Sequence, residues 1–238
     1  MTRVDPTTGD VLSTTPLTSY ELLSAPLFTK ANASGDFVAI AGNSPIVALD
    51  GRSQGILWAR PDFNGLYTMF VIAEDGSAVY TVYYVSGFDC VFKALSMATG
   101  KALWTTERLS QCASNENPSI GFGMLLYPIG NTVYAFNTTT GSTVWTSQFS
   151  NAEIPTSVSV GPPTSHLILI SGTYTDESLY VVHAHNGSVA WDTDEYGGVQ
   201  PVLTSDGQLI MADTSQGAVS SLDLNTGQLL WQVPVSCA

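Results

Sequence analysis

The chain has 238 residues, and its 20 acidic and seven basic side chains give a formal net charge of −13 at pH 7. Such an acidic surface repels phosphate backbones and anionic lipids, which argues against nucleic-acid binding and against a peripheral membrane role. No stretch reaches the roughly 18 apolar residues of a membrane span, and residues 1–6 lack the apolar core of a signal peptide.

An eleven-residue motif recurs from one end of the chain to the other, and its last position is tryptophan in five of the six copies. The copies occupy residues 3–13, 48–58, 94–104, 135–145, 181–191 and 221–231. Their final positions lie 40 to 46 residues apart, a period that indicates an array of one supersecondary unit. The first copy is degraded, because it ends in Ser13 instead of tryptophan.

Each copy is predicted to be a β-hairpin. In the last copy, residues 219–223 and 228–231 are short apolar or β-branched runs that flank Asn225-Thr226-Gly227. The glycine is expected at positive φ, and the residue eight positions before the tryptophan is expected to bond the amides of the turn. That earlier position holds Asp5, Asp50, Ser96, Asn137, His183 and Asp223, of which His183 suits the role least.

The tryptophans are predicted to act as wedges between neighbouring repeats. Burying one indole removes roughly 150–250 Å² from water, an upper bound of ~4–6 kcal/mol per repeat. One hairpin cannot bury such a ring alone, so the repeats must pack against one another. The structural residues assigned to the repeat are Asp50, Trp58, Gly100, Trp104, Gly141, Trp145, Gly187, Trp191, Asp223, Gly227 and Trp231.

Two further strand-like segments precede each hairpin, so each repeat is predicted to be a four-stranded antiparallel blade of an all-β propeller. A helical solenoid is disfavoured, because no window carries a sustained apolar stripe of helical period. Five full blades are expected in a single domain, at about residues 17–58, 66–104, 117–145, 154–191 and 196–231. Residues 2–13 and 233–238 are expected to supply a partial sixth blade, the latter as a first strand.

Strands can be placed within these blades. Those of blade one are expected near residues 25–29, 37–42, 46–50 and 56–59. Blade two has a strongly β-forming second strand at residues 78–85, and blade three is compressed, with strands near 119–122, 124–127 and 132–136. Blade four has a buried central strand at residues 167–170, and blade five begins with strands at 198–203 and 207–212.

The motif Ala-x-Asp-x-x-Thr-Gly-x-x-Leu-Trp resembles the repeat of the pyrroloquinoline-quinone (PQQ) quinoprotein family, which includes quinoprotein alcohol dehydrogenases. The resemblance covers nearly the whole chain and implies the blade type. It does not imply a chemistry, because non-catalytic relatives such as the bacterial outer-membrane assembly lipoprotein use the same repeat. Those relatives usually have eight blades, which favours a fragment of a seven- or eight-bladed propeller over a six-bladed ring with a defective closing blade.

Enzymes of this family also carry adjacent cysteines at the cofactor and calcium-binding Glu, Asn and Asp side chains from several blades. The present sequence departs from that pattern, since it has no adjacent cysteines and no placeable calcium ligands. We therefore expect no cofactor; PQQ and calcium belong only to the alternative of a quinoprotein fragment.

The three cysteines leave two interpretations open. Cys90 and Cys112 flank the last two strands of blade two, so either a disulfide between outer loops or free thiols would fit. Cys237 is left without an obvious partner. The glycosylation pattern occurs at Asn32, Asn137 and Asn186, but the last two lie in repeat turns, so only Asn32 is a plausible acceptor. An extracytoplasmic or secreted setting is slightly favoured over the cytosol.

Catalytic and metal-binding candidates are weak. His183 and His185 could face one side of a strand, but a zinc site needs a third ligand and none is local. Residues 192–195 offer three carboxylates but lack the glycine and the spacing of a calcium loop. No nucleophile elbow, phosphate loop or His-Glu-x-x-His stretch occurs. No catalytic, cofactor-binding or metal residue is therefore assigned.

The function expected from these observations is a non-catalytic binding or scaffold propeller that presents loops to an unknown protein or glycan partner. The alternative is a fragment of a PQQ-dependent dehydrogenase. A calcium-stabilised extracellular adhesion module is a weaker third hypothesis.

Overall fold

The computed structural model describes most of the chain as β-strands and the turns between them. The described residues are 2–4, 11–14, 27–28, 38–41, 46–50, 56–60, 68–73, 75–112, 118–149, 155–172, 178–194, 201–213 and 217–235. Every secondary-structure element in these ranges is a β-strand. Within them there is accordingly no helix of the length and hydropathy needed to cross a membrane.

One two-stranded sheet and five four-stranded sheets follow one another along the described chain, and we number the latter blades one to five. The two-stranded sheet pairs β1 (Thr2–Val4) with β2 (Val11–Thr14). Blades one and two contain β3 (Leu27–Phe28), β4 (Val38–Ala41), β5 (Ile46–Asp50), β6 (Ile56–Arg60), β7 (Thr68–Ile72), β8 (Ala78–Ser86), β9 (Asp89–Ser96) and β10 (Ala102–Thr105).

Blades three to five have the same plan. They contain β11 (Ser119–Gly121), β12 (Met124–Ile129), β13 (Thr132–Asn137), β14 (Thr143–Gln148), β15 (Pro155–Val160), β16 (Leu167–Gly172), β17 (Leu179–His183), β18 (Val189–Thr193), β19 (Val202–Leu203), β20 (Gln208–Asp213), β21 (Ala218–Asp223) and β22 (Leu229–Pro234). Each blade is an antiparallel meander whose strands pair in chain order.

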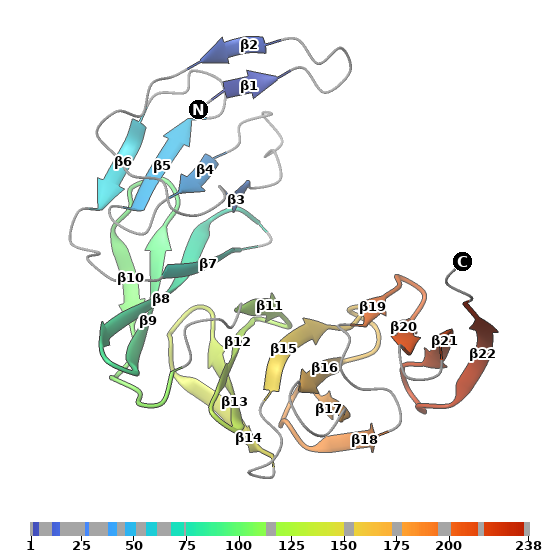
Figure 1. Ribbon diagram of the computed structural model, residues 1–238. Coiled ribbons are helices and arrows are strands. Elements are labelled where there is room, and N and C mark those ends of the chain that lie inside the picture. Colours follow the sequence, from blue (N-terminus) through green and yellow to red (C-terminus); the bar gives the residue numbers. More distant parts are fainter. Residues whose placement is uncertain are drawn as a thin grey trace.

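The blades lie side by side along an open arc, with the β1–β2 hairpin at one end and β22 at the other (Figure 1). The first strand of each blade faces the inside of the arc, and the last strand lies at its outer rim (Figure 1). This is the radial arrangement of propeller blades. The predicted all-β class and four-stranded antiparallel blade are confirmed.

Most expected strands coincide with observed ones to within a few residues, and two differ. Of the expected strand at residues 198–203, the structure describes β19 over Val202–Leu203, and residues 195–200 lie outside the described part. Val233 and Pro234 do not begin a separate strand; they continue β22 and pair with Val219 and Ala218. The rim strand of blade five is therefore longer than the motif alone indicated.

The apolar core lies between neighbouring blades. Leu126 and Ala135 of blade three pack with Ile168 and Val182 of blade four, and all four side chains are fully buried. Because blades two to four contribute both faces of their middle strands to such layers, each of them depends on its neighbours for its stability.

The tryptophans that end four of the motifs dock on the following blade. The indole N–H groups of Trp58, Trp104, Trp145 and Trp191 donate to the backbone carbonyls of Met97, Thr138, Ala184 and Leu224, at 2.7, 2.7, 2.8 and 2.8 Å. The first three indoles are only 8–9% exposed. The predicted wedge is thus confirmed for four tryptophans, and each wedge also makes a directed hydrogen bond.

Two structural constraints require glycine at the motif position: a positive φ and a close contact with a tryptophan ring. Gly100, Gly141, Gly187 and Gly227 all have φ between +66° and +74°, as the turn requires. A Cβ added at any of them would also lie 2.5–2.9 Å from a ring atom of the docked tryptophan. The indole of one blade therefore lies directly on the turn of the next, a contact that we call the Trp–Gly interlock.

A recurrent bulge aims the tryptophan inward. In every blade the register between the third and fourth strands shifts just before the tryptophan, as between Ala102 and Trp104. The extra residue points outward, so that Leu57, Leu103, Val144 and Leu230 are 47–58% exposed. Bulges of this kind turn a strand locally and re-aim its side chains. The exposed apolar residue of each Leu-Trp pair follows from this geometry.

The polar position of the motif caps the turn in two copies. The Asp223 carboxylate accepts from the amides of Asn225 and Thr226 at 3.0 and 2.9 Å, and Asn137 bonds the corresponding turn amides. In the copy with His183, Asn186 instead accepts from the Ser188 amide at 3.0 Å. Of Asp50 only the backbone is described, at the end of β5.

The interlock predicts unequal costs for equivalent tryptophans. Trp145→Ala should lower the free energy of unfolding by about 3–5 kcal/mol, because it removes a buried ring and the partner of the Ala184 carbonyl. Trp231 is 40% exposed and no described glycine turn packs on it, so Trp231→Ala should cost less than half as much. Equilibrium urea unfolding measures both values, and equal losses would contradict the interlock.

Glycine substitutions separate backbone strain from the ring contact. Gly76 has φ +70° and open space around its missing Cβ, whereas Gly187 has φ +71° with Trp145 only 2.5 Å from that position. Gly76→Ala should cost about 1–2 kcal/mol from the left-handed conformation alone. Gly187→Ala should cost a further ~1–3 kcal/mol from overpacking. Matching losses in urea unfolding would mean that the ring contact contributes nothing.

Candidate binding site

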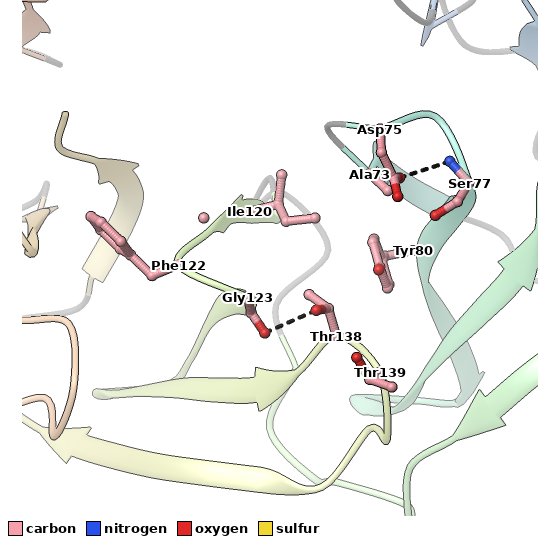
Figure 2. Close-up of a pocket in the computed structure, with 10 residues that line it drawn as sticks. Ala73, Asp75, Ser77, Tyr80, Ile120, Phe122, Gly123, Thr138 and Thr139 are labelled. Atoms are coloured by element: carbon pink, nitrogen blue, oxygen red, sulfur yellow. Dashed lines mark hydrogen bonds between the residues drawn. The ribbon is translucent and has the colours of Figure 1, made fainter. Parts of the chain in front are cut away.

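A cavity of about 340 Å³ lies between blades two and three, at the end of the blades where the first-to-second and third-to-fourth strands turn (Figure 2). We call it the interblade cavity. Its lining comes from the β7–β8 turn and the start of β8 on one side, and from the β11–β12 and β13–β14 turns on the other.

The blade-two side is a tight turn with the sequence Asp75-Gly76-Ser77. Gly76 takes φ +70°, and its amide donates to the Ala73 carbonyl at 2.9 Å. The Ser77 amide donates to Oδ1 of Asp75, also at 2.9 Å. Asp-Gly pairs favour such turns because glycine accepts positive φ and the short carboxylate bonds nearby amides. The turn thereby fixes Asp75 and Ser77 at the mouth of the cavity.

The blade-three side is held by Thr138. Its amide and its hydroxyl both donate to the Gly123 carbonyl, at 3.0 and 2.9 Å, so the β13–β14 turn is tied to the β11–β12 turn (Figure 2). The Thr138 carbonyl accepts from the Trp104 indole at 2.7 Å. The same interlock that joins the two blades therefore also fixes one wall of the cavity.

Tyr80 lies on the inner side of the cavity. It is 5% exposed, and its ring centroid lies 5.8 Å from that of Trp104. Ala73 and Ile120, both half-buried, add apolar surface. The exposed Thr139 lies at the rim beside Thr138. The cavity thus combines an aromatic and aliphatic interior with a rim of hydroxyls and one carboxylate.

The two titratable groups of the lining are shifted in different directions. Hydrogen bonds from the Ser77 hydroxyl and amide lower the pKa of Asp75, so its carboxylate is charged at neutral pH. Burial is the main cause that raises the pKa of Tyr80; a hydrogen bond with Thr138 opposes it, and the charge of Asp75 adds to it. The described part of the lining therefore carries one negative charge beside a neutral phenol.

Two aromatic residues with strained backbones lie next to the cavity. Phe122 and His166 both have φ +52°, and their rings are in tilted contact across blades three and four, with centroids 5.7 Å apart and an interplanar angle of 33°. The backbone of Phe122 belongs to the cavity lining, but its ring points away from the centre (Figure 2). This ring contact packs the β11–β12 turn against the next blade.

A second cavity, of about 360 Å³, lies at the outer rim. The segment after β10 and the β13–β14 turn line it, with Thr106, Glu107 and Ser142 among its polar residues. Its position beside the interlock glycine Gly141 places it next to the rim strand and away from the inner strands.

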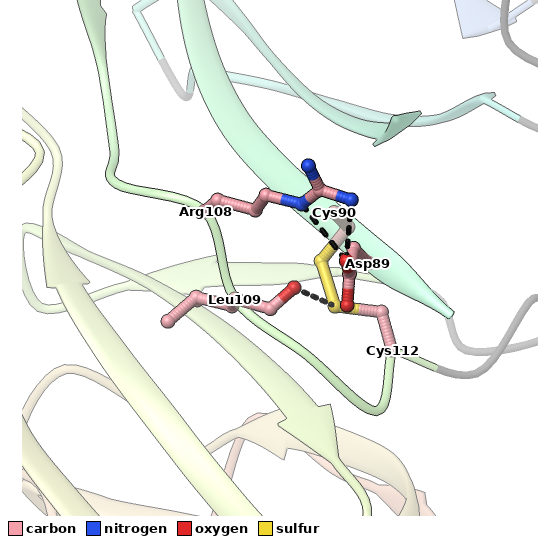
Figure 3. Close-up of polar contacts among 5 residues, drawn as sticks. All are labelled: Asp89, Cys90, Arg108, Leu109 and Cys112. Carbon is pink, nitrogen blue, oxygen red and sulfur yellow. Dashed lines mark hydrogen bonds and ion pairs between the residues drawn. A yellow bond between two sulfur atoms is a disulfide. The ribbon is translucent and has the colours of Figure 1, made fainter. Parts of the chain in front are cut away.

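Cys90 and Cys112 form a disulfide that clips the segment after β10 to blade two (Figure 3). Their Cα atoms are 6.0 Å apart and both residues are buried. Cys90 and Leu109 exchange both backbone hydrogen bonds, at 2.8 and 2.9 Å, and the Cys112 amide donates to the Phe88 carbonyl at 2.7 Å. The Cys112 sulfur lies 3.8 Å from the Leu109 carbonyl oxygen, a contact only, since a disulfide sulfur has no proton to donate.

An ion pair lies outside this clip. Arg108 Nε donates to Oδ2 of Asp89 at 2.8 Å (Figure 3). The side chains are 53% and 31% exposed. Exposed pairs of this kind contribute little to stability, so the disulfide and the backbone bonds hold the segment.

The other candidates from the sequence do not assemble into a site. His183 and His185 lie with ring centroids 5.7 Å apart. In the part of the chain that the structure describes, no group of three or more His, Cys, Asp or Glu side chains could hold a metal ion. Asn137 caps its turn, while Asn32 and Glu195 lie outside the described residues.

The residues of the interblade cavity were not predicted as a site from the sequence. Asp75-Gly76-Ser77 carried a local signal for a turn between two strand-forming runs. Nothing local placed that turn opposite Thr138, because the contact depends on how two blades dock.

The sequence matches a family model described as "Outer membrane protein assembly factor BamB" over residues 1–233. No curated protein matches the chain.

Solved structures share the fold at low sequence identity. BamB from Moraxella catarrhalis superposes with a TM-score of 0.66 at 17% identity, covering 89% of this chain and 66% of that one. The quinohemoprotein alcohol dehydrogenase ADHIIG from Pseudomonas putida HK5 gives 0.60 at 15% identity, covering 84% and 40%. The C-terminal WD40 domain of Sif2 gives 0.66 at 14% identity, covering 98% and 65%. The chain spans less than two thirds of each of these proteins.

The disulfide predicts a redox-dependent stability. Reduction should lower the free energy of unfolding by about 3 kcal/mol, because it releases a 22-residue loop in the unfolded chain. Urea unfolding with and without dithiothreitol measures this in a Cys237→Ser background, which removes intermolecular exchange. The matched Cys90→Ala/Cys112→Ala variant should not respond to the reductant. An unchanged free energy of unfolding after verified reduction would show that the disulfide does not stabilise the fold.

Proposed function

Because the chain belongs to the family of the outer membrane protein assembly factor BamB, we propose that it is a non-catalytic β-propeller scaffold that binds a protein partner. The family match over residues 1–233 is the observation that carries the proposal. The family is named for the assembly of outer membrane proteins, and this favours a protein over a glycan as the partner.

The architecture supports such a role. Trp–Gly interlocks fix each blade against the next, so the turns are presented on a rigid support. Turn residues such as Asn137 and Asp223 are held by their own hydrogen bonds, which lowers the entropic cost of ordering them on binding. The interblade cavity lies among the turns that join first to second and third to fourth strands, a surface that we call the turn face. The cavity offers a concave feature for a partner there.

The disulfide supports an extracytoplasmic setting. Cys90 and Cys112 are buried and bonded, and such bonds persist mainly in oxidising compartments. This setting agrees with the outer-membrane role in the name of the family.

The dehydrogenase alternative receives no equivalent support. ADHIIG is 15% identical, a likeness that concerns the fold, and the chain spans 40% of that protein. In the described part of the chain no group of three or more His, Cys, Asp or Glu side chains could hold a metal ion, and the sequence contains no adjacent cysteines. These two observations favour the scaffold over the dehydrogenase alternative.

Cofactor loading tests the non-catalytic part of the proposal. After incubation with PQQ and calcium followed by gel filtration, the chain should retain no quinone absorbance and should not reduce a redox dye with primary alcohols. A verified quinoprotein dehydrogenase, treated in parallel, controls for the loading procedure. Retained quinone together with alcohol-dependent dye reduction would overturn the proposal.

Site-specific cross-linking tests the binding part. A photo-reactive residue at the exposed Thr139 of the turn face should give a discrete protein adduct in cells of the source organism, identifiable by mass spectrometry. The matched control at Val144 lies on the exposed side of rim strand β14 and should give none. Equal labelling at both positions, or none at either, would contradict a turn-face partner.

A further inference from the structure

We propose that the interblade cavity receives a lysine or arginine side chain from a protein partner. The identification of the source as a protein rests on the proposed scaffold function. The cationic character of the ligand rests on the cavity itself, on its charge, its shape and its rigidity.

The charge of the lining selects a cation. Among the lining residues that the structure describes, Asp75 and Tyr80 are the ionisable ones, and none is Lys, Arg or His. The carboxylate of Asp75 is charged and the phenol of Tyr80 is neutral, so the local charge is negative. The chain as a whole carries a net charge of −13, which adds long-range attraction for a basic partner.

The shape of the cavity suits a long side chain with a charged end. At about 340 Å³ it lies near the small end of ligand pockets, which span roughly 300–1,000 Å³. Ala73, Ile120 and the Tyr80 ring offer apolar surface for the methylene stem of Lys or Arg. The π-face of tyrosine also attracts cations. The hydroxyl of Ser77 adds an acceptor beside Asp75, and that of Thr139 adds one on the blade-three side (Figure 2).

The acceptor groups are held in place before any ligand binds. The Asp75 carboxylate is fixed by the Ser77 amide at 2.9 Å, and Thr138 is fixed by its two bonds to the Gly123 carbonyl. Tyr80 is packed against Trp104, whose indole holds the opposite turn. A preorganised acceptor set lowers the entropic cost of binding a flexible side chain.

Other ligand classes fit the lining less well. An anion would meet the charge of Asp75, and no basic residue in the described lining offsets that charge. A calcium ion prefers six to eight oxygen ligands, including more than one carboxylate in most sites, and the described part of the lining supplies one carboxylate. An ammonium or guanidinium group needs only one carboxylate and a few neutral acceptors.

Blade five supplies a matched comparison. Asp206-Gly207 forms the equivalent β19–β20 turn, with Gly207 at φ +83°, and hydrogen bonds from Thr204 and Gln208 also lower the pKa of Asp206. Asp206 does not belong to the lining of the interblade cavity. Asp206→Asn therefore removes an equal charge from an equivalent turn without touching the proposed site.

Peptide binding to the full chain tests the proposal. The probes are blocked pentapeptides with Lys, Arg or norleucine between paired glycines, titrated by isotope-edited NMR. The Lys and Arg peptides should shift the amide signals of Ser77, Gly123 and Thr139, and norleucine should not. Asp75→Asn keeps an acceptor for the Ser77 amide and should weaken the shift-derived affinity at least tenfold, whereas Asp206→Asn should leave it within twofold.

A second variant and two rival probes complete the design. Thr139→Trp should occlude the mouth and abolish the shifts even if Asp75→Asn is poorly folded. Equal effects of Asp75→Asn and Asp206→Asn, equal binding of norleucine, or preferential binding of glucose or calcium would each overturn the cationic site. Cofactor loading and cross-linking at Thr139 test the scaffold function separately, so the two failures are distinguishable.

Discussion

Each described indole from Trp58 to Trp191 rests on a glycine of the next blade and donates its N–H to a carbonyl of the same turn. This contact links three levels of the structure. The bulge before the tryptophan aims the ring, the glycine accepts both the positive φ and the ring, and the hydrogen bond fixes the depth of insertion. Without it, a four-stranded blade would expose one face of its middle strands.

The same contact explains why the chain is organised as a repeat. Each wedge reaches a carbonyl in the turn of the following blade, 33 to 39 residues further along the chain, and the period of the motif accordingly stays between 40 and 46 residues. Loops outside the interlock are free to vary. In blade two these variable parts include the long β8–β9 hairpin and the segment after β10, which the Cys90–Cys112 disulfide joins to β9.

The sequence predicted the parts of the fold that local chemistry determines. The Thr-Gly turns, the tryptophan wedges and strands such as 46–50 and 132–136 followed from composition and period. The outward bulge residue and the second role of the glycines did not, because both depend on a neighbouring blade. The interblade cavity was missed for the same reason: Asp75 and Thr138 are brought together only when two sheets dock. The pairing of Cys90 with Cys112 also required the path of the segment after β10.

A double-mutant cycle between Trp145 and Gly187 tests the central claim most directly. Unfolding free energies are measured for the parent chain, Trp145→Ala, Gly187→Ala and the double variant. If the ring rests on the glycine, Gly187→Ala should cost much less once the ring is gone, with a coupling of about 1–3 kcal/mol. Additive losses, within about 0.5 kcal/mol, would show that the two residues act independently and would contradict the interlock.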